Sequence, residues 1–204
     1  MDSSLGKFEL QKFASRKPQF ENCMEQILSL GYDGPDFIHH FPAFTGHLTL
    51  SRFLNLYEAY KMTLGVAGHI AEIGVYKGAG SLFFAKLSRI FEPETLTLVH
   101  GFDNFQGAVV TEEEKYVTDG ECLEDYDRVI KLIHAQGLEN IVHIHKLDVT
   151  TDLDQFFTDN SHLQFKLIFV DCGCYEVVSA TLKQFWPRVT SGGIMMFDHF
   201  NHEV

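Results

Sequence analysis

Four apolar runs in this sequence end on a glycine or on a carboxylate that could contribute to a binding or catalytic site. Gly74 follows the run Ile70–Ile73, and Asp103, Asp171 and Asp198 close three later runs. Carboxylates accept hydrogen bonds from hydroxyls, take up protons and hold metal ions. If the runs are parallel strands, their carboxyl ends meet at one edge of a sheet, where ligands bind. We therefore expect one site in which three carboxylates lie beside a glycine turn.

The glycine turn lies in Glu72–Ser81, EIGVYKGAGS, and leads into the amphipathic stretch Leu82–Phe91. This pattern predicts a strand, a turn and a helix. Glycine permits positive φ and lets backbone N–H groups approach a ligand closely. The start of the helix offers unpaired N–H donors and a positive dipole end to a carboxylate or phosphate. The segment therefore predicts a site for a nucleotide-like small molecule.

Two features favour another adenosine-containing ligand over a nicotinamide dinucleotide, and so disfavour an NAD-dependent oxidoreductase. Asp103, which we expect to bind a ribose, follows Gly74 by more than the ~20 residues typical of the dinucleotide fingerprint. The glycines also depart from G-x-G-x-x-G. In addition, Glu72 lies inside a strand, where a carboxylate is costly unless paired. The ammonium group of S-adenosylmethionine is a suitable partner.

The remaining pattern predicts an α/β fold with a doubly wound, mostly parallel sheet, because near-continuous apolar strands alternate with helices. The predicted strands are His69–Val75, Thr97–Asp103, Ile141–Lys146, Lys166–Asp171 and Gly193–Asp198. The predicted helices between them are Ser81–Phe91, Leu123–Gln136, Asp152–Asp159 and Glu176–Val189.

A helical segment, residues 1–48, is expected to precede the domain of residues 49–204. Apolar residues at helical spacing predict helices over Gln19–Leu30 and Thr49–Leu64. Between them, Gly34–Gly46 is expected to be a loop that can fold over the site. A second long segment, Gly107–Glu121, is acidic. Such runs are usually solvated loops, and the alternative is a lid beside the ligand.

Three segments together resemble the macrocin O-methyltransferase family, within the class I S-adenosylmethionine-dependent methyltransferases. They are Glu72–Ser81, Gly101–Gly107, and the pair Phe169–Glu176 with Gly192–Phe200. The resemblance implies a Rossmann-like fold, S-adenosylmethionine as cofactor, and methyl transfer to a hydroxyl of a sugar or small natural product. The cofactor-binding residues that it implies are Glu72, Gly74, Tyr76, Gly78, Ser81, Asp103, Asp148 and Asp171. Asp103 would hold the ribose, and Asp148 would lie at the adenine edge.

The resemblance also implies a divalent metal, Mg²⁺ or another ion, at Asp171, Asp198 and His199. Asp171 and His199 are the expected catalytic residues, with His199 a candidate general base because histidine titrates near neutral pH. The sequence departs from the family here, since Cys172-Gly173 and His199 stand where the family carries Gly-Asp and Asp. Mg²⁺ prefers oxygen ligands, whereas histidine suits Mn²⁺, Fe²⁺, Co²⁺ or Zn²⁺.

Other candidate ligands have simpler interpretations. Cys172 and Cys174 form a single C-x-C, too few ligands for a structural zinc site, and we expect them to pack at a strand end. His143 and His145 alternate along a strand and share one face. We expect them to be ordinary polar-face residues.

Composition limits the partners. The net charge, 16 − 28 = −12, argues against binding to nucleic acid or anionic membranes. The sequence has no apolar run of about 18 residues and no signal-like N-terminus, and its four cysteines form no recognisable disulfide framework. We therefore expect a cytoplasmic protein.

The chain ends soon after Asp198, before the antiparallel hairpin that usually completes this fold. Either the sequence is a piece of a longer chain, or the fifth strand is an exposed edge that another chain covers. We expect a homo-oligomer that forms through this edge or through the N-terminal helices. The alternative to an enzyme is a degenerate methyltransferase fold that serves as an interaction module without catalysis.

Overall fold

The computed structural model describes residues 17–107 and 122–198, which separate into two compact units. Described residues 17–55 belong to the first unit, and residues 56–198 to the second. The first unit is helical. Its elements are α2 (Lys17–Ser29), α3 (Gly34–His39), α4 (Phe41–Phe44) and the first half of α5 (His47–Met62).

The prediction of a loop over Gly34–Gly46 is wrong, because most of this segment is helical. Asp33 and Asp36 form a reciprocal capping box, each side chain accepting from the other residue's backbone N–H, and Pro35 lies in the first turn. Both features stabilise a helix start. The ring of Phe44 packs against Phe37, with ring centroids 4.6 Å apart. The prediction of a lid here stays untested.

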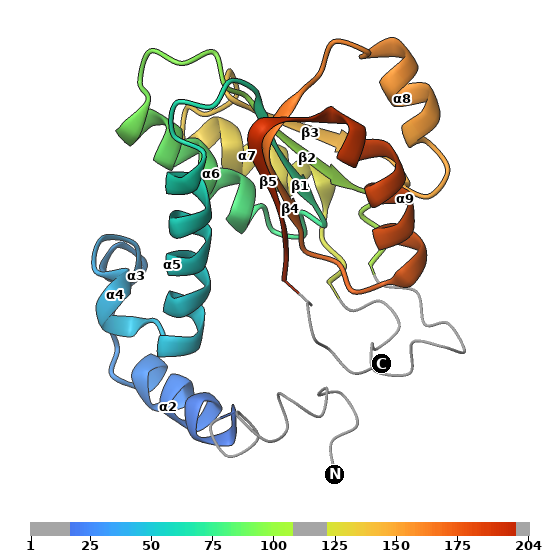
Figure 1. The fold of residues 1–204 in the computed structure, drawn as a ribbon. Helices are drawn as coiled ribbons and strands as arrows, with labels where there is room; N and C mark the ends of the chain where they lie inside the picture. The colour runs from blue at the N-terminus through green and yellow to red at the C-terminus, as the bar shows by residue number, and fades with distance from the viewer. Residues whose placement is uncertain (1–16, 108–121, 199–204) are drawn as a thin grey trace. The chain divides into compact units, whose positions relative to one another are not determined.

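The second unit is built on a five-stranded parallel sheet in the order β3-β2-β1-β4-β5 (Figure 1). The strands are β1 (His69–Ile73), β2 (Val99–Asp103), β3 (Val142–Lys146), β4 (Phe165–Val170) and β5 (Val189–Phe197). The helices between them are α6 (Ala79–Phe91), α7 (Tyr126–Ala135), α8 (Leu153–Asp159) and α9 (Tyr175–Phe185), the last followed by a 3₁₀ turn at Trp186–Arg188. All five predicted strands and four predicted helices exist, and the predicted doubly wound α/β fold is confirmed.

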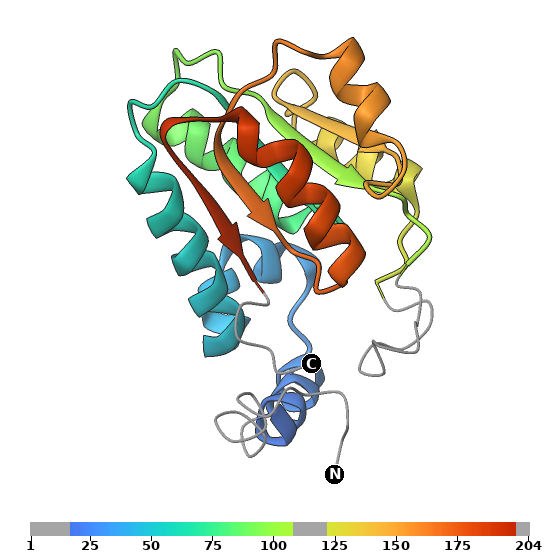
Figure 2. The same ribbon diagram turned by 45° about the vertical axis from the view of Figure 1, so that its right-hand side comes forward.

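Helices cover both faces of the sheet. Figure 2 shows α9 in front of the sheet and α6 behind it. On the α8 and α9 side, Phe157 and Phe185 pack with ring centroids 4.9 Å apart, and both rings reach Phe165 of β4. On the other side, Phe84 of α6 meets Phe169 edge-on at 6.2 Å. Two aromatic-rich layers therefore form the core and hold the central strands in place.

The fifth strand begins four residues earlier than predicted, because a bulge lets the chain pass through two glycines without ending the strand. The register with β4 shifts between Phe165 and Leu167. Gly192 has φ +84°, and a Cβ on Gly193 would lie 2.9 Å from the carbonyl oxygen of Thr190. Glycine accommodates both conditions, so a sequence that looks like a turn is part of the strand.

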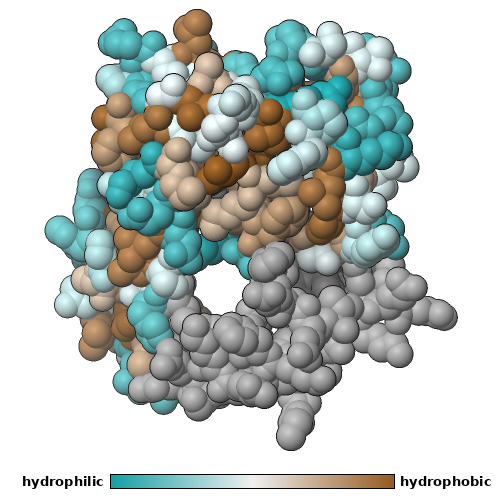
Figure 3. Space-filling model, viewed as in Figure 1, coloured by the Kyte–Doolittle hydropathy of each residue, from teal (hydrophilic) through white to brown (hydrophobic). Residues whose placement is uncertain are grey.

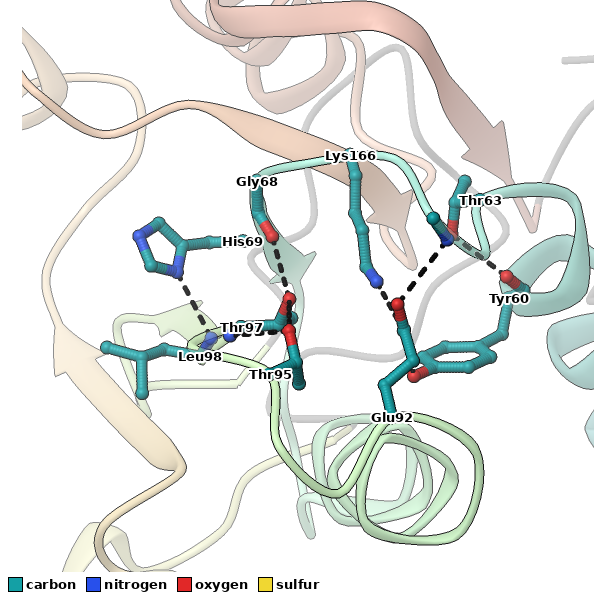
Figure 4. A network of polar contacts seen from close by, with 10 residues as sticks. Tyr60, Thr63, Gly68, His69, Glu92, Thr95, Thr97, Leu98 and Lys166 are labelled. Atoms are coloured by element: carbon teal, nitrogen blue, oxygen red, sulfur yellow. Dashed lines mark hydrogen bonds and ion pairs between the residues drawn. The ribbon is translucent and has the colours of Figure 1, made fainter.

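A buried ionic network lies at the amino ends of the strands (Figure 4). Lys166 of β4 is fully buried, and its Nζ lies 2.5 Å from Oε2 of Glu92, which follows α6. Tyr60 of α5 donates its hydroxyl to the same oxygen at 2.6 Å. Burial raises the pKa of Tyr60, and its hydrogen bond to Glu92 adds to the effect. Burial alone would raise the pKa of Glu92, but the bonds from Lys166 and Tyr60 outweigh burial and lower it.

Within the part of the sheet that the structure describes, β3 and β5 are the edge strands. Figure 3 shows apolar atoms gathered on the face where β5 lies, and most residues of β5 are partly exposed. None of the helices in the described ranges is long and apolar enough to cross a membrane.

Candidate active site at the carboxyl ends of the strands

The predicted gathering of strand ends is present in the structure. The backbone N–H of Gly74 donates to a backbone carbonyl of β2 at 3.0 Å. The N–H of Asp171 donates to a carbonyl of β1 at 2.8 Å, and the N–H of Asp198 donates to a carbonyl of β4 at 3.0 Å. Asp103 closes β2 in register beside them. The four tips therefore lie along one sheet edge in the spatial order Asp103, Gly74, Asp171, Asp198.

The order of the strands places Gly74 and Asp171 at a topological switch point. From β1 the chain moves outward to β2 and β3, and then crosses back to the other side of β1 for β4 and β5. Ligands of such sheets bind outside the carboxyl ends of the strands at this point. Gly74 has φ +86°, and a Cβ there would overlap the carbonyl oxygen of Asp171. Only glycine allows this close approach.

Glu72 is 1% exposed and has partners within the protein. Its Oε2 accepts the backbone N–H of Ser81 at 2.6 Å and also the Ser81 hydroxyl. Gly78, the residue before α6, has a left-handed conformation and gives no side-chain cap. Glu72 therefore supplies the missing acceptor at the start of α6. Ser81 therefore provides the partner that this buried carboxylate needs, and a ligand ammonium is not required for that purpose.

Asp103 uses its carboxylate on three backbone N–H groups. Oδ2 accepts from Val75 at 2.8 Å and from Tyr76 at 2.9 Å, while Oδ1 accepts from Phe105 at 2.7 Å. The carboxylate thus ties the glycine turn after β1 to the tip of β2. The sequence pattern predicted a ribose partner and gave no sign of these bonds.

Asp148 lies in the turn after β3, and its carboxylate bonds locally. Oδ1 accepts from the backbone N–H of Thr150 at 2.8 Å and from its hydroxyl at 2.6 Å. The backbone of the turn is held by Asp152, which accepts the N–H of Asp148 at 2.9 Å. Leu147 donates its N–H to the Asp103 carbonyl at 3.0 Å, so this turn adjoins the tip of β2.

The predicted metal ligands are described only in part. Asp171 and Asp198 end neighbouring strands, whereas His199 lies outside the described residues. Within residues 17–107 and 122–198, no group of three or more His, Cys, Asp or Glu side chains is arranged to hold a metal ion. The described donors therefore do not make a complete metal site.

A row of histidines was missed by the sequence analysis. His100 of β2 is 6% exposed, stacks on His143 and His145 of β3, and meets His69 of β1 edge-on. His145 also packs among aromatic rings, with centroids 4.9 Å from Phe102. The prediction of ordinary polar-face residues is therefore wrong for His145. The only sequence signal was the strand alternation that puts both β3 histidines on one face.

Burial shifts the titration of this row. Burial, followed by the neighbouring His145 and His69, lowers the pKa of His100 to about 3. Burial and then His143 lower the pKa of His145 to about 4. Nδ1 of His100 lies 3.0 Å from Nε2 of His145, so one ring donates to the other. Both rings are therefore neutral at physiological pH.

The residues that line a cavity of about 360 Å³ do not include Gly74, Asp103, Asp171 or Asp198. The cavity is between α7 and the edge strand β3, and Tyr126, Ile133 and His143 are among its lining residues. The cavity therefore gives no support to the predicted site, which rests on the strand ends instead.

The fold and the glycine turn at its switch point define a Rossmann-like, nucleotide-cofactor-binding α/β protein. A family model described as "Methyltransferase domain" matches residues 71–200. The match covers well over half of the chain, and the chain belongs to this family of methyltransferases. The predicted S-adenosylmethionine-dependent class is thereby confirmed.

Two comparisons give relatives of this chain. It is 26% identical over 179 residues to the 8-demethyl-8-(2,3-dimethoxy-α-L-rhamnosyl)-tetracenomycin-C 4'-O-methyltransferase of Streptomyces olivaceus, covering 84% of this chain. The chain spans 66% of the length of that relative. The calicheamicin methyltransferase CalS11 has a similar structure, with a TM-score of 0.82 and 21% identity over 95% of this chain and 82% of that one. The O-methyltransferase NovP superposes with a TM-score of 0.58 and 20% identity, covering 72% of this chain and 64% of NovP.

Proposed function

We propose that this chain transfers the methyl group of S-adenosylmethionine to a hydroxyl of a sugar or a sugar-bearing small natural product. The observation that carries the proposal is the row of strand tips, in which Gly74 and Asp171 meet at the switch point with Asp103 and Asp198 on either side. The family supports the reaction type. The acceptor class is supported by the tetracenomycin relative, whose name gives a rhamnosyl substrate, and by CalS11, described as a TDP-rhamnose 3'-O-methyltransferase.

S-Adenosylmethionine, when bound, supplies an electrophilic methyl group on a positively charged sulfur. Transfer breaks the sulfur–methyl bond and forms an oxygen–methyl bond, so the hydroxyl proton must pass to a base. Asp171 is our candidate base, because its backbone adjoins Gly74, where we place the cofactor. His199 is the second candidate. Alignment of the acceptor is the larger task for the remaining residues, since it makes a bimolecular step effectively unimolecular.

The test is Asp171→Asn, assayed with a set of rhamnosylated acceptors. Loss of a general base typically costs about 100-fold or more in rate. We expect a kcat reduced by at least roughly 100-fold, while the Kd for S-adenosylhomocysteine changes little. The matched control is Asp159→Asn, an exposed carboxylate at the end of α8 that accepts from Gln155. Unchanged turnover in Asp171→Asn would remove the assigned role.

Calorimetric titration separates the proposal from its alternatives. Binding of S-adenosylhomocysteine together with methyl transfer supports the enzyme. Binding without transfer to any acceptor favours an interaction module that has kept the cofactor site. Binding of NAD in place of S-adenosylhomocysteine would favour an oxidoreductase.

Metal assistance is a separate part of the proposal, with Asp171, Asp198 and His199 as ligands. A divalent ion would lower the pKa of an acceptor hydroxyl. Activity that is lost in EDTA and restored better by Mn²⁺ or Co²⁺ than by Mg²⁺ would support a histidine-containing site. Activity that is unchanged in EDTA would remove the metal.

We also propose that the chain is cytoplasmic. For its assembly, we propose that two copies associate through the β5 edge. An exposed apolar strand edge invites pairing, and β5 is such an edge in the described sheet. Sedimentation at high concentration measures it directly.

A further inference from the structure

The carboxylate of Asp103 joins two strand tips that are distant in sequence. Its Oδ2 bonds the N–H groups of Val75 and Tyr76, which lie 28 and 27 residues earlier in the chain. These bonds to a carboxylate are charge-assisted and therefore roughly twice as strong as neutral ones. They cross from β2 to the glycine turn after β1, so they fix the part of the turn that precedes α6.

Two of the three donors have a strained backbone. Tyr76 has φ 49° and Phe105 has φ 57°, both in the left-handed region. Residues other than glycine keep this conformation only where their surroundings impose it. The Asp103 carboxylate bonds both N–H groups, and Phe105 is further held by Tyr126 of α7, with ring centroids 5.3 Å apart. Tyr76 is 37% exposed and has less packing to hold it.

The same bonds limit what Asp103 can offer a ligand. A carboxylate has about four acceptor positions, and three of them are used by Val75, Tyr76 and Phe105. Recognition of a ribose diol by two hydrogen bonds needs two further positions. One remains.

We infer that Asp103 is a positioning residue, which holds the glycine turn in its binding conformation before the cofactor arrives. Asp103 then increases cofactor affinity by holding the backbone of Val75 and Tyr76 in place, and this effect does not depend on the ribose hydroxyls. The inference rests on the proposed function for the identity of the ligand, but the conformation of the turn is measurable without any ligand.

Hydrogen exchange of the ligand-free protein tests the positioning directly. In the wild-type chain, the amide of Tyr76 should exchange at least about 100-fold more slowly than an unstructured amide, although its side chain is exposed. Asp103→Asn replaces one oxygen by an NH₂ group and removes the negative charge, so the charge-assisted bonds to Val75 and Tyr76 are weakened in either orientation of the amide. Their amides should exchange roughly tenfold faster.

The matched control is Asp125→Asn, an exposed carboxylate that accepts from the backbone N–H of Asp127 at the start of α7. It should leave the turn unchanged. An unprotected Tyr76 amide in the wild type would overturn the inference, whether or not Asp103→Asn folds.

Affinity for two ligands separates positioning from ribose binding. Asp103→Asn should raise the Kd for S-adenosylhomocysteine and for its 2′,3′-dideoxy analogue by the same factor, roughly tenfold. A penalty for S-adenosylhomocysteine alone would show direct ribose recognition and overturn the inference. If the wild-type chain binds neither ligand, the proposed function fails, while the exchange measurement still decides the role of Asp103.

Discussion

Glu72 places its carboxylate beneath the first turn of α6, where the residue before the helix has no side chain to cap it. The cost of burying this charge is offset by the N–H and hydroxyl of Ser81, since a buried carboxylate is tolerated when it is hydrogen-bonded. The arrangement also needs space, because the carboxylate lies against the backbone of Gly80. One glycine of the predicted cofactor turn is thus required by the fold itself.

Gly80→Ala should therefore destabilise the protein although Gly80 is helical. Its new Cβ would lie 2.8 Å from Cδ of Glu72 and overlap the nearer oxygen. We expect a loss of about 2 kcal/mol, the usual cost of overpacking a buried site, measured by urea unfolding. The control is Gly34→Ala in α3, where nothing lies within 4 Å of the added carbon. Equal effects of the two substitutions would contradict this account.

The helices α5 and α6 and the strand β4 are joined by one buried charge pair. Lys166 is fully buried and the Glu92 side chain is 17% exposed, and Tyr60 completes the contact from α5. Removing one partner of a buried pair leaves an uncompensated charge, which costs more than the pair itself contributes. These three residues are far apart in sequence, and no local pattern indicates that they meet.

Lys166→Met should destabilise the second unit by about 3 kcal/mol, because Glu92 is left charged and without its cation. Adding Glu92→Gln should recover part of the loss, since the neutral amide needs no counter-ion. Lys61→Met is the control, because the pair of Lys61 with Glu58 is largely exposed and contributes about 0.5 kcal/mol or less. Chemical denaturation of the wild type and these variants gives the comparison. A double variant that is less stable than Lys166→Met would refute the explanation.

The sequence predicts the strands well, because a buried parallel strand is a continuous apolar run with a polar end. That rule alone places Gly74, Asp103, Asp171 and Asp198 at strand ends. It fails at Gly192, where the glycines of a bulge look like a turn. It also fails over Gly34–Gly46. The proline and glycine content of this segment indicated a loop, whereas the capping pattern Asp33-x-x-Asp36 indicated the helix start that the structure contains.

The partners of each site residue are less predictable than its position. Asp103 bonds amides 27 and 28 residues away, and His100 lies against histidines from two other strands. Both arrangements depend on the order of strands in the sheet, which no local sequence pattern contains. The edge at which the site forms could therefore be predicted, but the hydrogen bonds within it could not.

The domain as a whole carries a row of histidines across β1, β2 and β3. His100 and His145 face one another. Neighbouring histidines contribute to the lowered pKa values of His69, His100 and His145 through charge repulsion. Burial is the largest cause of every lowered pKa in the row, and it also lowers the pKa of His69. Protonation of both His100 and His145 would place two like charges on rings that lie side by side. Folding therefore disfavours protonation of these two rings.

Stability should fall as the pH falls below about 6.5. The unfolded chain protonates its histidines near that pH, whereas the folded domain keeps His145 and His100 neutral down to about 4 and 3. Their contribution is complete above the unfolded value and is lost toward the folded values. Urea unfolding between about pH 7.5 and about pH 4.5 should show a loss on the order of a few kcal/mol.

His145→Phe is the diagnostic variant, because a phenyl ring without a titrating nitrogen replaces the imidazole between Phe102 and Phe156. It should reduce the pH dependence and leave the part that His100 contributes. The lowered pKa of Glu92 acts only below the ordinary value of 4.5 and does not overlap most of this range. A pH dependence equal to that of the wild type would exclude His145 as its source.

The buried contacts of Lys166 lie where the strands begin, while the residues of the candidate site lie where they finish. The buried ion pair and the two carboxylates Asp171 and Asp198 thus lie at opposite ends of one sheet. Substitutions around these carboxylates can alter the choice of acceptor while the ion pair stays intact. Directed evolution toward new hydroxyl acceptors should therefore tolerate more variation around Asp171 and Asp198 than around Tyr60, Glu92 and Lys166.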